Sequence, residues 1–206
     1  VYFTQNGVDG WAQYGYGSTL PYSSAVVDVS GQGLYIFALF ADGTVKRTTD
    51  GGYTWHNYGD AGTDTNWVSI GTNGERVYAL GSDGKVMRSS VSSLYWTSWG
   101  DVGTDTAWVD IVVTEDYNYV LSSEGRVRYS QDSSSTWGNK GDVGVDSNWV
   151  SLGVYDDDGY VYAMNNVRAV YRASSGSSTS WSSWASATTG PASWVGLTIT
   201  EDYIFV

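Results

Sequence analysis

The sequence contains no cysteine, and its 206 residues include only two prolines and one histidine. Without cysteine the chain can form neither disulfides nor thiolate zinc sites. The single histidine, His56, leaves little from which to build a Ser-His or Cys-His catalytic pair. No stretch approaches 18 consecutive apolar residues, so we expect no membrane insertion. We therefore predict a protein with no cofactor, no catalytic metal and no catalytic residues.

Basic residues are also scarce. Lys and Arg number 10 against 22 Asp and Glu, which gives a formal net charge of −12 at pH 7. Such a surface repels phosphate backbones, so we expect no nucleic-acid partner. Aspartates that accumulate in turns and an adaptation to high salt are two alternative explanations of this acidity. Both favour an exposed location, and we expect an extracellular protein or one on a virion or cell surface.

What the chain does have is a repeat of 41 residues. Trp67-Val68-Ser69-Ile70 recurs as Trp108-Val109-Asp110-Ile111 and as Trp149-Val150-Ser151-Leu152, and a related segment starts 45 residues later at Trp194. Short apolar runs with a period of two, separated by glycine-containing turns, predict strands rather than helices. Strand-rich repeats of about 40 to 45 residues are typical of β-propeller blades, which must stack to bury their apolar faces.

We predict an all-β fold, a single five-bladed β-propeller with four-stranded antiparallel blades over residues 1–206. Residues 194–203 match 108–117, and residues 1–11 match 127–137, so the two ends supply two strands each to one blade. This arrangement closes the ring with the N- and C-terminal strands and removes exposed sheet edges. The predicted blades are 26–66, 67–107, 108–148, 149–193, and 194–206 joined with 1–25.

A seven-residue spacing precedes each tryptophan of a second series. The segment from Thr48 to Trp55 resembles the Asp-box, Ser/Thr-x-Asp-x-Gly-x-Thr/Ser-Trp, of sialidases and other bacterial neuraminidase repeats, and the segment from Ser130 to Trp137 keeps its aspartate. The resemblance implies a folding element on the hairpin between the third and fourth strands, away from any active site. A turn aspartate accepts backbone N–H bonds while the tryptophan packs between sheets.

The size and the inner tryptophans also resemble five-bladed lectins of the tachylectin-2 type. In that family a strand Trp, an apolar strand, an Asn/Asp-Gly turn and a Tyr-Ala strand follow in order, as in Trp67, Val68-Ser69-Ile70, Asn73-Gly74 and Tyr78-Ala79. The resemblance implies a propeller that binds carbohydrate. The chain departs from the family in carrying Asp-box remnants and in lacking paired prolines before the fourth strand.

Three loops that connect consecutive blades share the pattern Gly-Asp-x-Gly-x-Asp, at 59–66, 100–107 and 141–148. A sugar needs a flat apolar surface and a few fixed hydrogen-bonding groups, which an aromatic ring and Asp or Asn side chains supply. The simpler interpretation is that Asp and Gly form the turns while the aromatic rings pack between blades. The predicted ligand-binding residues are Tyr58, Asp60, Asp64, Asn66, Trp99, Asp101, Asp105, Asp142, Asp146 and Asn148.

These features predict a non-catalytic, lectin-like module with several weak sites that binds glycans on a cell or virus surface. One alternative is a structural platform for protein contacts in a fibre, capsid or surface layer. Another is a propeller glycosidase, for which two carboxylates about 5 to 10 Å apart are required. Only Asp28 and Asp110 lie on predicted first strands. Because the chain begins at Val1, we expect that it is processed or excised from a larger polypeptide or assembly.

Overall fold

The computed structural model is all-β, as the sequence predicts. Every element among the described residues is a β-strand, and the strands pair in antiparallel order throughout. No helix in this part of the chain has the length and apolar character needed to cross a membrane. The structure describes residues 2–3, 12–13, 24–63, 66–103, 107–144, 148–155, 158–167, 169–186, 195–199 and 204–205.

Four sheets have four strands each, and we call them blades 1 to 4. Blade 1 contains β3 (Val26–Gln32), β4 (Tyr35–Phe40), β5 (Thr44–Thr48) and β6 (His56–Asp60). Blade 2 contains β7 (Trp67–Thr72), β8 (Arg76–Gly81), β9 (Lys85–Ser90) and β10 (Thr97–Asp101). Blade 3 contains β11 (Trp108–Val113), β12 (Tyr117–Ser122), β13 (Arg126–Gln131) and β14 (Gly138–Asp142). Blade 4 contains β15 (Trp149–Tyr155), β16 (Tyr160–Asn165), β17 (Ala169–Ser174) and β18 (Ser182–Ser186).

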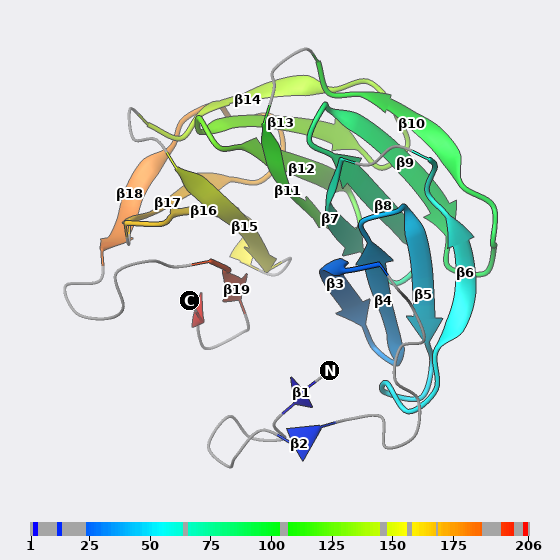
Figure 1. The fold of residues 1–206 in the computed structure, drawn as a ribbon. Coiled ribbons are helices and arrows are strands. Elements are labelled where there is room, and N and C mark those ends of the chain that lie inside the picture. The colour runs from blue at the N-terminus through cyan, green and yellow to red at the C-terminus, as the bar shows by residue number, and fades with distance from the viewer. Residues whose placement is uncertain are drawn as a thin grey trace.

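The blades fan out around a common axis (Figure 1). Their first strands, β3, β7, β11 and β15, lie side by side at the centre, and the fourth strands form the outer rim. The register between the first two strands repeats, with Trp67 opposite Gly81 and Trp108 opposite Ser122. An irregularity follows each of these tryptophans, as bulges commonly do where a side chain must be redirected.

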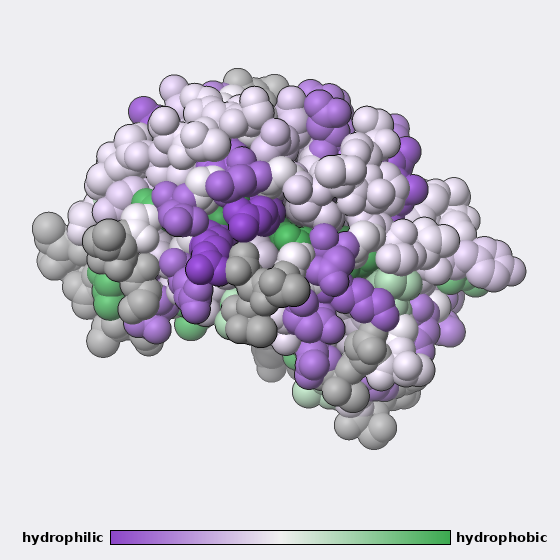
Figure 2. Space-filling view, turned by 90° about the horizontal axis from the view of Figure 1, so that it is seen from above, coloured by the Kyte–Doolittle hydropathy of each residue, from purple (hydrophilic) through white to green (hydrophobic). Residues whose placement is uncertain are grey.

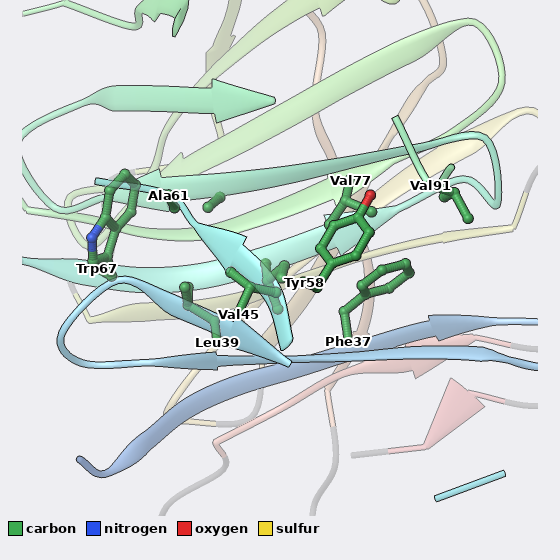
Figure 3. Close-up of a cluster of buried hydrophobic side chains, with 10 residues drawn as sticks. Phe37, Leu39, Val45, Tyr58, Ala61, Trp67, Val77 and Val91 are labelled. Atoms are coloured by element: carbon green, nitrogen blue, oxygen red, sulfur yellow. The ribbon is translucent and has the colours of Figure 1, made fainter. Parts of the chain in front are cut away.

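The core is distributed between blades because each sheet buries its faces against the next. Between blades 1 and 2, Phe37, Leu39 and Val45 meet Trp67 and Val77 in one cluster (Figure 3). Trp67, Trp108 and Trp149 are each at most 4% exposed. The first-strand tryptophans are therefore packing residues, as their repeated position indicates.

The ends of the chain differ from the prediction of a fifth four-stranded blade. β1 (Tyr2–Phe3) pairs with β2 (Ala12–Gln13), and β19 (Thr198–Ile199) pairs with β20 (Ile204–Phe205), as two separate two-stranded sheets. Both hairpins lie in the sector between blades 4 and 1 (Figure 1). Among the described residues there are thus four complete blades and no strand pairing that closes the ring.

The surface view in Figure 2 is dominated by hydrophilic and weakly polar residues. Hydrophobic residues appear on this side only in small patches between them. Large exposed apolar side chains include the adjacent pairs Leu34 with Tyr35 and Leu94 with Tyr95, and also Val195. Small groups of exposed apolar residues of this kind are normal on protein surfaces, and we base no functional argument on them.

Candidate functional site

The two aromatic residues predicted to face a ligand lie in the core. Tyr58 is fully buried, its ring packs edge-on against Phe37, and its hydroxyl donates to the backbone carbonyl of Ser90 in the next blade (Figure 3). Trp99 is 9% exposed, and the guanidinium of Arg88 lies 3.5 Å from its ring centroid. Both rings are on the inward side of a fourth strand, where they fill the space between blades. A stacking surface for a sugar would have to come from other residues.

The predicted acidic residues that the structure describes are exposed. Asp60 accepts a hydrogen bond from the backbone N–H of Gly62 at 2.7 Å, and Asp101 accepts the equivalent bond from Gly103 at 2.8 Å. This local bond is the Asx-turn that short acidic side chains favour. Asp142 occupies the same position in blade 3 and is exposed as well. The repeated loops therefore display carboxylates, and their use of one oxygen to form the turn agrees with the simpler structural interpretation.

The remaining predicted residues fall at the ends of these loops. Asn66 and Asn148 are exposed, and their carbonyls accept from Ser82 and Asn166. Asn148 has a φ of 70°, a left-handed conformation that asparagine tolerates better than most residues, which gives it a backbone role. Asp64, Asp105 and Asp146 lie outside the described residues. Ligand binding by the loop set therefore stays a prediction.

At the axis, side chains from consecutive first strands form a hydrogen-bonded chain. The Ser69 hydroxyl lies 2.8 Å from Asp28 Oδ2 and 2.8 Å from Asp110 Oδ1. Asp110 Oδ2 in turn lies 3.0 Å from the Ser151 hydroxyl, which accepts from the N–H of Leu197 at 3.2 Å. These residues border an axial hollow of about 400 Å³.

Backbone amides bind the same two carboxyls. Asp28 accepts from the N–H of Ile70 at 2.8 Å, and Asp110 accepts from the N–H of Leu152 at 2.7 Å. Each aspartate therefore connects its own blade to the first strand of the next. Carboxyl groups held in this way bind the blades to one another, and their oxygens are engaged with protein donors.

The geometry around Ser69 requires an additional proton. A hydroxyl has one hydrogen, so Ser69 can donate to only one of the two carboxyls. A contact of 2.8 Å to the other is favourable only if that carboxyl carries a proton and donates to Ser69 Oγ. In agreement, burial raises the pKa of Asp110 to about 6, and burial also raises the pKa of Asp28. A proton on Asp110 at mildly acidic pH would therefore complete this hydrogen bonding, and its effect on stability is a prediction.

The segment of blade 1 that resembles an Asp-box forms a closed local network. Asp50 accepts from the Thr48 hydroxyl at 2.6 Å and from the Thr54 N–H at 2.9 Å. Hydrogen bonds from these two threonines, first that of Thr48, hold the pKa of Asp50 well below its usual range. The network involves only residues of its own loop, which is the arrangement of a folding element.

Further hollows lie between blades at the opposite end of the strands from the Gly-Asp loops. This end carries the turns between first and second strands and the loops between third and fourth strands. The 1/2 hollow, of about 610 Å³, is bordered by Tyr35, Arg47, Glu75, Arg76 and Val91. The 3/4 hollow, of about 260 Å³, is bordered by Glu115, Asp116, Tyr117, Tyr155, Tyr160 and Ser175. An adjoining hollow of about 420 Å³ shares Glu115, Asp116 and Tyr117 with the 3/4 hollow.

The sequence analysis did not predict that the basic side chains between the blades would be site residues. Arg47 donates to the Val91 carbonyl at 2.6 Å, and Arg76 donates to the Asp132 carbonyl at 2.8 Å while pairing with the Asp132 carboxylate at 2.9 Å. Lys140 is fully buried and donates to the carbonyls of Ser174 and Gly176. Burial lowers the pKa of Lys140 to about 8. One indication of this site is visible in the sequence: Lys140 occupies the repeat position at which the two preceding blades have Tyr58 and Trp99.

The comparisons with known proteins identify the fold. No protein-family model and no curated protein sequence matches the chain. A chain of the nidogen/laminin complex is similar in structure, with a TM-score of 0.71, 8% identity, and coverage of 88% of this chain and 71% of that chain. YCF48 bound to D1 peptide gives a TM-score of 0.64, 16% identity, and coverage of 88% and 59%. The computationally designed Ika4 protein gives a TM-score of 0.60, 14% identity, and coverage of 77% and 96%.

The nidogen and YCF48 structures are β-propeller proteins, so the four described blades belong to a propeller fold. At identities of 8 to 16% the likeness concerns the fold alone.

Proposed function

We propose that this chain is a non-catalytic recognition propeller that binds a protein partner. The observation that carries the proposal is the set of hollows between blades, which are open at one end of the strands and bordered by charged and aromatic side chains. Aromatic and arginine side chains beside a concavity are typical of protein-contact sites. The engagement of Asp28 and Asp110 with backbone amides supports a binding role over hydrolysis at the axis.

Two of the similar structures point in the same direction. One contains a nidogen/laminin complex and the other holds YCF48 with a D1 peptide, so in both cases the propeller-containing structure is a complex with a protein or peptide. These partners belong to those proteins. They support a protein-binding role for this chain only by analogy of fold.

A peptide array probed with the intact 206-residue chain tests this function. We expect discrete peptides to bind, and we expect the Asp60→Ala, Asp101→Ala double variant to bind the same peptides, because both aspartates lie at the opposite end of the strands. A blank array, together with specific glycan binding, would replace the proposal by the carbohydrate alternative.

Carbohydrate binding is the second candidate function, on glycans of a cell or virus surface. The favouring observation is the repeated display of exposed carboxylates at Asp60, Asp101 and Asp142, at matching positions of three blades. Sites of this kind would be shallow, and engagement at several points raises avidity roughly 10²–10⁴-fold. A glycan array in which binding weakens stepwise from the single Asp101→Ala variant to the double variant would support it.

We also propose that the two terminal hairpins form the inner and outer halves of a fifth blade. Thr198 pairs with Phe205 as Val112 pairs with Tyr119, and Tyr2 pairs with Gln13 as Arg128 pairs with Asn139. Each hairpin therefore has the register of one half of blade 3. By the same register, Phe205 and Phe3 correspond to Tyr119 and Tyr129, which are opposite each other in blade 3.

A disulfide test follows from this register. Because the chain has no cysteine, a Phe3→Cys, Phe205→Cys double variant contains only the introduced pair, and we expect it to form an intramolecular disulfide on mild oxidation. The matched Ala12→Cys, Phe205→Cys variant should stay reduced, because Ala12 belongs to the outermost strand. Equal oxidation of the two variants, or none in either, would argue against a shared fifth blade.

A further inference from the structure

The interfaces between blades provide an internal comparison, because the same backbone position recurs in each. Val91, Asp132 and Ser175 each donate their N–H to a turn carbonyl of their own blade, that of Glu75, Asp116 and Gly159 respectively. The three residues are therefore equivalent, in blades 2, 3 and 4. The carbonyls of Val91 and Asp132 accept hydrogen bonds from the preceding blade, and Ser175 lines the 3/4 hollow beside blade 3.

At the first two interfaces a guanidinium from the preceding blade binds this carbonyl. Arg47 of blade 1 binds the carbonyl of Val91, and its guanidinium carbon lies 5.8 Å from the ring centroid of Tyr35 and 5.2 Å from that of Tyr58. Arg76 of blade 2 binds the carbonyl of Asp132. The chain thus uses two different strand positions to bring an arginine to the same place.

At the third interface both of these positions are tyrosine. Tyr117 corresponds to Arg76, and Tyr129 corresponds to Arg47, as the identical register of the second and third strands shows. The 3/4 hollow lies here, beside Ser175. Among its described lining residues there is no arginine or lysine, whereas the 1/2 hollow is bordered by both Arg47 and Arg76.

Two nearby cations have other partners. Lys140 of blade 3 reaches this interface, but its buried ammonium donates to the carbonyls of Ser174 and Gly176 on either side of Ser175, and it does not line the 3/4 hollow. Arg172 is at the strand position equivalent to Arg47. Its guanidinium carbon lies 4.4 Å from the ring centroid of Tyr160, and Arg172 does not line the 3/4 hollow. Neither is hydrogen-bonded to Ser175.

The lining of the 3/4 hollow suits a cation. Tyr117, Tyr155 and Tyr160 are partly exposed there, and aromatic faces attract cations electrostatically. Glu115 and Asp116 are exposed at its rim and can form charge-assisted hydrogen bonds with a guanidinium. The adjoining hollow leaves room for the residues that flank such a side chain. The chain's net charge of −12 favours approach of a basic partner.

We infer that the 3/4 hollow is a binding site for an arginine side chain of the protein partner, which takes the place that Arg47 and Arg76 occupy at the other interfaces. The inference rests on the proposed protein-binding function and names the chemistry of the partner. The partner's guanidinium lies against Tyr117 and Tyr160 and donates to the carboxylates of Glu115 and Asp116 and to the Ser175 carbonyl.

The test is a titration of the intact chain, followed by NMR, with the tripeptide acetyl-Gly-Arg-Gly-amide and with its citrulline counterpart. Citrulline keeps the shape of arginine and removes the charge. We expect the citrulline tripeptide to bind at least tenfold more weakly. Equal binding of the two, or displacement of the arginine tripeptide by a simple sugar at this hollow, would overturn the inference.

Variants locate the site. Tyr129→Arg supplies an internal guanidinium at the position of Arg47, and we expect it to reduce the affinity for the arginine tripeptide at least tenfold. Glu115→Gln with Asp116→Asn, at exposed positions that leave the core intact, should reduce the affinity at least threefold. Glu75→Gln at the 1/2 hollow is the matched control and should leave the affinity unchanged. Undiminished binding by folded Tyr129→Arg protein and by the Glu115, Asp116 variant would contradict the assignment.

Failure of the arginine-site inference can be distinguished from failure of the proposed protein-binding function. If the peptide array gives hits without any preference for arginine and neither tripeptide binds, the arginine site is wrong while protein recognition stands. If the array is blank as well, both are wrong.

Discussion

Replacing Trp108 with alanine is expected to lower the free energy of unfolding by about 3–5 kcal/mol, the range found for large buried aromatic side chains. Trp108 is completely buried at the start of β11. It packs with Val86 and Val102 of blade 2 in the core between blades. Its removal would leave a cavity that the surrounding sheets can fill only partly, because the backbone of both blades is fixed by strand pairing.

Chemical denaturation of the variant and the parent measures this effect. Tyr95→Ala is the matched control, since Tyr95 is 83% exposed and its loss should change the unfolding free energy by less than about 0.5 kcal/mol. An unchanged unfolding free energy for Trp108→Ala, combined with loss of ligand binding, would show that this tryptophan is a contact residue.

The stability of the protein should fall by up to about 3 kcal/mol between pH 4 and pH 7 through the axial carboxyl of Asp110. Burial raises the pKa of Asp110 from 3.8 to about 6, and each pKa unit corresponds to about 1.4 kcal/mol. Between these two pH values the folded protein binds more protons than the unfolded chain. The stabilisation is therefore fully present below pH 3.8 and is lost as the pH rises through about 6.

Comparison with Asp110→Asn isolates this contribution from the other titrating groups. The variant cannot titrate at this position, so its unfolding free energy should decline less steeply than that of the parent from pH 4 to pH 7, by the part that Asp110 contributes. Guanidinium or urea unfolding curves at several pH values measure the difference in slope. Parallel pH profiles for the two proteins would mean that Asp110 keeps an ordinary pKa and that no proton is shared across Ser69.

Much of the fold could be predicted from the repeat alone. The offset of 41 residues places Trp67, Trp108 and Trp149 at equivalent points, and a repeated unit that cannot bury its own faces has to stack. The strand pairs of blades 1 to 4 follow that register. The arrangement of the two chain ends was harder to predict. Matching of repeats shows which segments are alike, but it does not show whether two separate hairpins pair with each other.

The candidate site was less accessible to sequence reasoning. An aromatic residue before a turn, as Tyr58 is, suits both a core and a binding face, and only coordinates show on which side of β6 the ring lies. The column of Asp28, Ser69, Asp110 and Ser151 was visible in the repeat. That one hydroxyl would bridge two carboxyls depends on the distance between first strands, which no sequence pattern gives.

The aligned repeats show that tyrosine replaces arginine at Tyr117 and Tyr129, but the sequence does not show what this replacement changes. Only the bonds of Arg47 and Arg76 to matching carbonyls reveal that the third interface lacks a guanidinium that the others have.

Recognition at the hollows between blades is tested most directly by amide chemical-shift mapping of the isotope-labelled chain during titration with the arginine tripeptide. We predict shifts concentrated at Glu115, Asp116, Tyr160 and Ser175, around the 3/4 hollow. Shifts concentrated instead at Asp60, Asp101 and Asp142, or at Ser69 on the axis, would contradict it.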